Sequence, residues 1–463
     1  MRRLQYFRHV LEAIGNTPLI QLNKVVRGQR PGPLILAKVE SFNPGGSVKD
    51  RIALDMVEAA ERAGQLKPGG TIVEGTSGNT GVGLALVAAI KGYRAVFTMP
   101  DKMAYEKVRL LRAYGADVIV TPTAVPPEHP GSYYSVARRI QQTTPNCVYP
   151  NQYDNQANPE AHYKTTGPEI WQQTDGKIDV FVCGVGTGGT ISGVGKFLKE
   201  QKPSVKIVGV DPEGSILKEF FDSGGKVIGK TFRTYKVEGI GEDLVPKALW
   251  WKYIDTVVRT DDREAFLLAR RLAREEGLLE GGSAGSAIAG ALKYVRAEQL
   301  GEDKVVVVLL PDTGERYLSK FYDDTWMRDN AFLGQEMTIG AMLSRKGSEI
   351  PPLVSVRPMD KVKDALELMN RIGVSQLPVV DEKGQSVGTV SEVELATKAL
   401  ENRIILDYPV GKHMGEPLPA LDETSPVPAA TELLRKHHAV LVRRGEHLIG
   451  ILTKFDVLEH LQA

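Results

Sequence analysis

Lys49 is the residue whose surroundings point most directly to chemistry. It stands in the run Ser41-Phe-Asn-Pro-Gly-Gly-Ser-Val-Lys-Asp50. A lysine amine with an ordinary pKa is protonated at neutral pH, so a lysine that forms a Schiff base must be desolvated and closely packed. Gly45 and Gly46 allow such packing. Lys49 alone also fits the start of a surface helix, because residues 49–57 have helical periodicity; two later glycine-rich runs favour the Schiff-base interpretation.

The first of these runs is Gly184-Val-Gly-Thr-Gly-Gly-Thr190, between a strand-like stretch at 178–183 and a predicted helix at 191–200. Backbone N–H groups at the start of that helix, with the hydroxyls of Thr187 and Thr190, would converge on an anion. The run therefore predicts a phosphate site.

A dinucleotide site is a rival interpretation of the same run. Gly184, Gly186 and Gly189 fit the pattern G-x-G-x-x-G, and Asp211 ends the next strand where a ribose-binding acid is expected. Taken alone, the run favours either site about equally, and a tight turn without a ligand is the third alternative. A dinucleotide site is disfavoured because it leaves the other runs unexplained.

The second run, Thr76-Ser-Gly-Asn-Thr80, also follows a strand and precedes a helix. Its N–H and hydroxyl donors suit a carboxylate, and Asn79 can hydrogen-bond a phenolic oxygen. In isolation the run also fits a helix N-cap. A further turn, 281–286, contains Ser283 and is weak as an isolated motif.

The elements that must position these runs alternate along residues 13–326, where strand-like stretches are separated by amphipathic helices. This alternation predicts an α/β fold with open, mostly parallel sheets joined by right-handed crossovers. The expected strands are 34–39, 71–74, 95–99, 117–120, 179–183, 206–210 and 304–310. The run 305–310 is typical of a strand buried on both faces.

A weak internal repeat follows. Each copy, the first beginning near Val362 and the second near Val427, has the order helix, strand, turn, strand, helix. Such small units bury little surface alone, so the two α+β copies should pack together. We expect a first domain at 1–327, a linker at 328–336 and a second domain at 337–463.

Composition excludes several classes of protein. The 463 residues carry 58 Lys and Arg against 57 Asp and Glu, so no overall field attracts nucleic acid or an anionic membrane. Two cysteines exclude a disulfide scaffold, and no apolar run predicts a membrane span or a cleaved signal. We expect a cytoplasmic protein without a metal site.

Together with Ile14-Gly-Asn-Thr-Pro-Leu19, these runs resemble the fold-type II pyridoxal phosphate enzymes of the β-replacement family, which have a tryptophan synthase β-like fold. The resemblance covers about residues 8–328. It implies that Lys49 binds pyridoxal phosphate covalently and moves the α-proton, that Asn79 contacts the 3′-oxygen, and that Ser283 faces the pyridine nitrogen. A serine partner favours β-elimination because it does not enforce a protonated pyridinium. The implied phosphate contacts are Gly186, Thr187, Gly188, Gly189 and Thr190, and the implied substrate contacts are Thr76, Ser77, Gly78, Thr80, Gln152 and Gly241.

Within this family, the runs 211–217, 237–241, 281–286 and 310–327 resemble the cystathionine β-synthase branch. That branch implies condensation of L-serine, or an activated serine or cysteine, with L-homocysteine to L-cystathionine, the first step of transsulfuration. Cysteine as first substrate would release hydrogen sulfide. The near alternative is a cysteine synthase, which uses O-acetylserine and sulfide. A nucleotide sensor with an inactive α/β domain is disfavoured by the intact Lys49 and phosphate loop.

The C-terminal repeat resembles a tandem CBS-domain pair, or Bateman module. Thr453-Lys-Phe-Asp456 matches the Thr-x-x-Asp pattern of such modules, whereas the first copy has Glu394 in place of Asp. The resemblance implies an adenosine ligand (S-adenosylmethionine, AMP or ATP) at Thr453 and Asp456, and a homodimer or larger homo-oligomer. A pair that only mediates oligomerisation is the alternative.

Two departures from the animal cystathionine β-synthases stand out. Only 12 residues precede Ala13, so their haem-binding N-terminal extension is missing and we expect no haem. Glu242 follows Gly241 where animal members have Tyr, so their homocysteine recognition is not carried over to Glu242.

Overall fold

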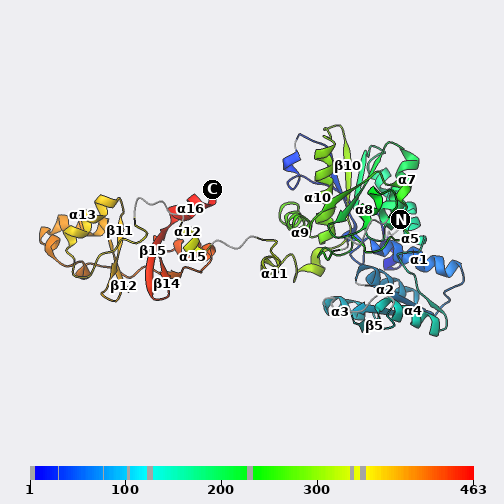
Figure 1. The fold of residues 1–463 in the computed structure, drawn as a ribbon, viewed down its shortest axis with the longest axis horizontal. Helices are drawn as coiled ribbons and strands as arrows, with labels where there is room; N and C mark the ends of the chain where they lie inside the picture. The colour runs from blue at the N-terminus through cyan, green and yellow to red at the C-terminus, as the bar shows by residue number, and fades with distance from the viewer. Residues whose placement is uncertain are drawn as a thin grey trace, which may run out of the picture. The chain divides into compact units, whose positions relative to one another are not determined.

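The computed structural model describes residues 6–29, 31–76, 78–101, 105–122, 129–226, 233–333, 338–344 and 351–462. The chain divides into two compact units, Met1–Leu333 and Gly334–Ala463, coloured blue to green and yellow to red in Figure 1. Helix α11 (Asp324–Asp329) and the packed side chains of Phe332 and Leu333 extend the first unit into the stretch expected to be a linker. Residues 334–336 of that stretch lie outside the described residues.

The first unit is built around a six-stranded sheet. Its strand order is β1 (Leu19–Gln21), β2 (Leu34–Val39), β10 (Val305–Leu310), β7 (Val180–Gly184), β8 (Lys206–Pro212) and β9 (Thr256–Thr260). Every neighbouring pair is parallel except β1 and β2. The prediction of open, mostly parallel sheets is confirmed.

Helices cover both faces of this sheet. Helices α9 (Asp262–Arg271) and α10 (Gly282–Ala297) pack together beside β10, as Figure 1 shows. Val306 and Val308 join the core that contains α10, whereas Val307 and Leu309 join the core that contains α7 (Gly189–Gln201). Strand β10 is therefore buried on both sides, as its unbroken apolar run predicts.

A second, wholly parallel sheet has the order β5 (Asp117–Thr121), β4 (Arg94–Pro100), β3 (Thr71–Gly75) and β6 (Cys147–Val148). Helices α1 (Lys49–Arg62), α2 (Asn79–Lys91) and α3 (Tyr105–Ala113) share one core with it, and α4 (Tyr133–Thr143) contributes to another. The remaining helices of the first unit are α5 (Ala157–Lys164), α6 (Thr166–Gln173) and α8 (Leu217–Asp222), with short 3-10 or π turns at Val10–Ala13, Arg27–Gln29, Glu40–Phe42, Trp251–Tyr253, Leu272–Glu276 and Gly314–Tyr317.

The second unit contains the two predicted copies. In the first copy, α13 (Val362–Ile372) is followed by the antiparallel strands β11 (Gln376–Val380) and β12 (Ser386–Ser391) and by α14 (Glu392–Glu401). In the second, α15 (Val427–Leu434) precedes antiparallel β14 (Ala439–Arg444) and β15 (His447–Thr453) and then α16 (Lys454–Gln462), which confirms the repeat. Strand β13 (Ala420–Asp422) pairs with β14, α12 (Ile339–Leu343) packs into the core of the second copy, and 3-10 turns lie at Arg403–Asp407 and Val410–Lys412.

Candidate active site

Lys49 is the first residue of α1 and lines a hollow at the carboxyl end of β7. Burial lowers the pKa of its amine, although the charges of Asp312, Glu242 and Cys183 act in the opposite direction. A lowered pKa increases the fraction of nucleophilic neutral amine, as a Schiff-base lysine requires. The hollow is lined by Val48, Lys49, Gly184, Gly186, Thr187, Gly188, Thr190, Ile191, Gly239, Ile240, Leu309 and Pro311.

The glycine-rich loop between β7 and α7 is packed so closely that it needs its glycines. Gly188 has a φ of +80°, in the left-handed region that favours glycine. A Cβ on Gly189 would lie 1.8 Å from Oδ1 of Asn158, and one on Gly186 would lie 2.7 Å from the carbonyl oxygen of Gly239. The loop leads into the N-terminus of α7, where free N–H groups can bind a phosphate.

Helix α5 fixes the two hydroxyls of this loop. Asn158 Nδ2 donates to Thr187 Oγ1 at 3.0 Å and to the carbonyl oxygen of Gln152 at 2.8 Å. His162 Nε2 lies 3.2 Å from Thr190 Oγ1. Burial, with a further contribution from Arg51, lowers the pKa of His162 to about 3, so its ring is neutral at neutral pH.

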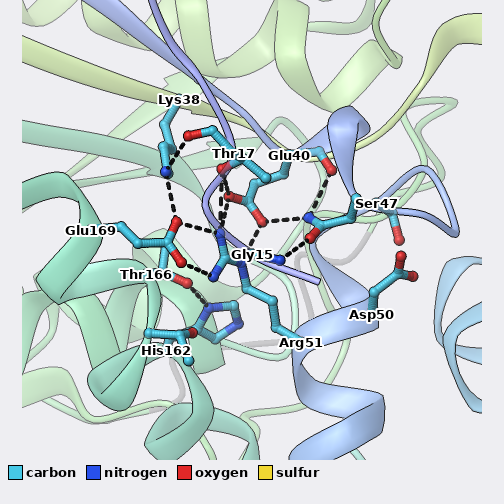
Figure 2. A network of polar contacts seen from close by, with 12 residues as sticks. Gly15, Thr17, Lys38, Glu40, Ser47, Asp50, Arg51, His162, Thr166 and Glu169 are labelled. Atoms are coloured by element: carbon cyan, nitrogen blue, oxygen red, sulfur yellow. Dashed lines mark hydrogen bonds and ion pairs between the residues drawn. The ribbon is translucent and has the colours of Figure 1, made fainter. Parts of the chain in front are cut away.

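A network of buried charges holds the beginning of α1. Arg51 donates to Glu40 and to Glu169, each at 2.7 Å, and Lys38 donates to Glu169 at 2.8 Å (Figure 2). Burial by itself would raise the pKa of Glu169, but its hydrogen bonds to Arg51 and Lys38 lower it to about 2. Two cations balance two carboxylates, so the network anchors Arg51 two residues beyond Lys49.

Residues 311–313 join three of the predicted runs. Val48 N–H donates to the carbonyl oxygen of Pro311 at 2.8 Å, and Gly281 N–H donates to that of Asp312 at 2.9 Å. Asn79 Nδ2 donates to the Asp312 carboxylate at 2.8 Å, and Asn79 Oδ1 accepts from Arg316. The Lys49 turn, the 76–80 run and the 281–286 run therefore meet at Asp312.

The run expected to hold a carboxylate lies at the start of α2. Thr76 Oγ1 accepts from the N–H groups of Gly78 and Gly81, both at 3.3 Å. Thr80 Oγ1 donates to Gln152 Oε1 at 2.7 Å, so these two predicted substrate contacts are neighbours. Ser77, also predicted to contact the substrate, lies outside the described residues.

The two other predicted residues, Gly241 and Ser283, both come from the C-terminal part of the first unit. Gly241 has a φ of +76°, and its N–H donates to the carbonyl oxygen of Val185 at 2.7 Å. Ser283 is buried near the N-terminus of α10, two residues after Gly281.

Asn158, His162, Asp312 and Arg316 were missed by sequence reasoning. None lies in a glycine-rich run, and α5 has no pattern that distinguishes Asn158 or His162 from other helical positions. Asp312 follows the buried strand β10, and polar residues after parallel strands gather at one sheet edge, which was the available signal.

The donor set fits pyridoxal phosphate. Lys49 is a buried amine for the aldehyde carbon, and the crowded loop at 184–190 supplies N–H groups and two hydroxyls for the phosphate. Within the described part of the chain, no three His, Cys, Asp or Glu side chains gather as a metal site. No helix among the described residues is both long and apolar enough to cross a membrane.

In the second unit, Thr453 and Asp456 close a capping box at the start of α16. The Asp456 carboxylate accepts from the N–H of Thr453 at 2.6 Å and from its hydroxyl at 2.8 Å. In return, Asp456 N–H donates to Thr453 Oγ1 at 3.5 Å. The corresponding Ser391 of the first copy makes no side-chain cap, and Glu394 is exposed.

Comparison with known proteins matches both units to families. The family described as "Pyridoxal-phosphate dependent enzyme" matches residues 10–312, and the CBS domain matches residues 348–401 and 410–463. Cystathionine beta-synthase of Oryctolagus cuniculus is 41% identical over 470 residues, covering 97% of this chain and 84% of the relative. That of Saccharomyces cerevisiae is 40% identical, covering 98% of each. A hydrogen sulfide-producing enzyme from Fusobacterium nucleatum has a similar structure, with a TM-score of 0.60 and 36% identity over 67% of this chain and 98% of that one.

Proposed function

The chain belongs to the pyridoxal-phosphate-dependent enzymes and carries a tandem pair of CBS domains, and we propose that it condenses L-serine with L-homocysteine to L-cystathionine. It is a pyridoxal-phosphate-dependent lyase of the β-replacement type, like its near-full-length relatives named cystathionine beta-synthase. The observation that carries the proposal is the meeting of the Lys49 turn, Asn79 and the 281–286 run at Asp312, beside the crowded loop at 184–190.

Lys49 would hold the cofactor covalently. The N–H groups at 186–190, with the hydroxyls of Thr187 and Thr190, would hold its phosphate, because they converge at the start of α7 beside Lys49. Asn79 would approach the 3′-oxygen and Ser283 the pyridine nitrogen. When bound, pyridoxal phosphate supplies the electron sink that makes the α-proton of an amino acid labile.

The chain's own residues would bind the amino acid and move its protons. Thr76, Gly78, Thr80 and Gln152 would orient the substrate carboxylate, because their donors cluster at the start of α2. Ser77 and Gly241 complete the proposed substrate contacts. The freed Lys49 amine would take the proton from the α-carbon and return it after the thiol has added at the β-carbon.

The nucleophile decides between the cystathionine and the cysteine synthase assignments. With serine as first substrate, we expect the purified enzyme to use homocysteine with a larger kcat/KM than sulfide, because the runs 211–217 and 310–327 resemble the cystathionine branch. The measurement is product formation with each nucleophile over a range of concentrations. A larger kcat/KM for sulfide would move the assignment to a cysteine synthase.

Hydrogen sulfide release from cysteine is a second proposed activity. The structural similarity to a hydrogen sulfide-producing enzyme supports it. Sulfide should appear when cysteine and homocysteine are supplied together, and should not appear with serine and homocysteine. Absence of sulfide with cysteine would exclude this activity.

We also propose that the CBS-domain pair binds an adenosine ligand through Thr453 and Asp456, and that the protein is at least a homodimer. The Asp456 carboxylate is anchored at the start of α16, where it can accept hydrogen bonds from ribose hydroxyls. Calorimetry with S-adenosylmethionine, AMP and ATP tests the ligand, and sedimentation tests the assembly. The holoenzyme should be yellow without a haem Soret band, and an intense Soret band would contradict this.

A further inference from the structure

We propose that Glu242 is a further catalytic residue of this chain and that its carboxylic acid donates the proton with which the β-hydroxyl of serine leaves as water. This inference rests on the proposed function, because it concerns serine as the first substrate. Hydroxide is a poor leaving group, so the carbon–oxygen bond breaks readily only if a proton is delivered to that oxygen.

The backbone places Glu242 at the edge of the Lys49 hollow. Gly239 and Ile240, just before it, line the hollow. Gly241 N–H is bonded to Val185 at the start of the glycine-rich loop. Glu242 N–H donates to Ser215 Oγ at 3.0 Å, and the carbonyl oxygen of Glu242 accepts from Ile216 N–H at 3.0 Å. The backbone is therefore fixed on both sides of the residue.

The side chain of Glu242 is partly buried among tyrosines. Its negative charge contributes to raising the pKa of four nearby tyrosines, which are Tyr133 and Tyr134 of α4, Tyr153 and Tyr235. The rings of Tyr133 and Tyr134 pack against each other, with their centroids 3.9 Å apart. The Glu242 carboxyl also lies close enough to Lys49 for their charges to interact.

The charges around Glu242 favour its protonated form. Burial first, and then the negative charges of Asp243 and Asp211, raise the pKa of Glu242 to about 8, although the charge of Lys49 lowers it. A carboxyl with this pKa is mostly protonated at neutral pH and can act as a general acid. Its pKa is also close to the operating pH, which is where proton transfer is most effective.

Lys49 and Glu242 would each carry one proton during the reaction. Lys49 takes the α-proton. When the carbon–oxygen bond breaks, the Glu242 O–H bond also breaks, the proton joins the leaving oxygen to form water, and Glu242 becomes a carboxylate. The incoming thiol then gives its proton to that carboxylate while its sulfur electron pair forms the new carbon–sulfur bond. Lys49 still has the α-proton to return, so both residues end as they began.

The decisive experiment compares two leaving groups in Glu242→Gln. Acetate leaves from O-acetylserine without being protonated, so this substrate does not need the acid. The first half-reaction is followed by rapid-mixing absorbance of the holoenzyme, with serine and separately with O-acetylserine. We expect Glu242→Gln to lower the rate of the first half-reaction by about a hundredfold or more with serine, and by less than about threefold with O-acetylserine. Glu302→Gln makes the same change at an exposed position of the first unit and serves as the matched control, with little effect on the rate with either substrate.

A pH series and a cofactor-free measurement give independent readouts. The wild-type rate with serine should fall as the pH rises through about 8, because the acid becomes deprotonated, and Glu242→Gln should lack this limb. Infrared difference spectra of the apoprotein should show carboxylic acid absorption that disappears over the same pH range in the wild type, and this absorption should be smaller in Glu242→Gln because only the other buried carboxyls, such as Glu74, still contribute. Melting temperature and cofactor titration show whether the variant is folded and loaded.

The outcomes separate this proposal from the proposed function. Equal slowing with both substrates would mean a structural role and would overturn the proposal, as would an unchanged serine rate in Glu242→Gln. A wild type that reacts with serine but does not form cystathionine with homocysteine would overturn the proposed function while leaving the Glu242 test intact. A wild type that reacts with O-acetylserine but not with serine would refute both.

Discussion

The phosphate loop of the first unit and the Thr453–Asp456 motif of the second are both short ligand-binding patterns before a helix, but they are built differently. The loop is held from outside: α5 contacts its hydroxyls, and the Asn158 side chain leaves no room for a Cβ on Gly189. The motif is held by itself, because Asp456 caps its own helix through Thr453. A site held by surrounding structure is sensitive to distant packing, whereas a self-contained motif depends on its own two residues.

The largest expected effect tests whether the first unit is the catalytic one. Lys49→Ala removes the amine that we expect to bind the cofactor covalently, so covalent attachment and turnover should both be lost. Borohydride reduction followed by peptide mass spectrometry should locate the cofactor on Lys49 in the wild type and nowhere in the variant. Trapping on another lysine would contradict the assignment.

The two units should also differ in how their stability depends on pH. Glu74 is buried in β3, and burial raises its pKa to about 8, although its hydrogen bond from Asn151 N–H acts in the opposite direction. The unfolded residue has an ordinary, lower pKa, so between about pH 4.5 and 8 the folded state holds a proton that the unfolded state has lost. The stabilisation is complete below that interval and is lost as the pH rises.

We therefore expect the free energy of unfolding of the first unit to fall between pH 5 and 8, and Glu74→Gln to reduce this fall by on the order of a few kcal/mol. Denaturant unfolding at several pH values measures the free energy of unfolding, and hydrogen exchange shows which unit the change belongs to. Asp175→Asn, at an exposed position, is the control. An equal fall in Glu74→Gln and the wild type would contradict the prediction.

A third prediction breaks the external support of the phosphate loop. Gly189→Ala would force Asn158 away from the loop and disturb its bond to Thr187. Overpacking of this kind typically costs about 1–3 kcal/mol, so cofactor affinity should fall by roughly ten- to a hundredfold. Gly28→Ala is the matched control, because a Cβ there meets nothing within 4 Å. Cofactor fluorescence titration measures both variants, and equal affinities would show that the crowding is unimportant.

Features that depend on local sequence could be predicted, whereas features that depend on surrounding structure could not. Strand β2 was predicted at its observed bounds, and the other predicted strands to within two residues, because apolar runs between helices are local signals. The short strands β1 and β6 and strand β9 were missed. The sequence also did not predict which strands share a sheet, because this depends on long-range pairing. Glycine-rich runs identified the loops of the site. Asn158 and His162 were missed because their importance comes from loops that fold against α5.

The smallest effect concerns the second unit, where the two copies of the repeat offer an internal comparison. Asp456 is anchored in a capping box, whereas Glu394 is exposed at the start of α14 and Ser391 does not cap that helix. If a ribose binds at the second copy, Asp456→Ala loses a charge-assisted hydrogen bond, typically about 1.5–3 kcal/mol, and adenosine ligands should bind roughly ten- to a hundredfold more weakly.

Glu394→Ala should leave that affinity unchanged, because the carboxylate at the first copy is not held in place by its helix. The capping loss in Asp456→Ala itself costs about 0.5–2 kcal/mol, so melting of the second unit must be measured beside calorimetry to separate binding from stability. Equal weakening in both variants would mean that the copies bind ligand alike. No heat with any of the three ligands at millimolar concentration in the wild type would instead leave the repeat as an assembly element, and the anchored Asp456 would then serve only to cap α16.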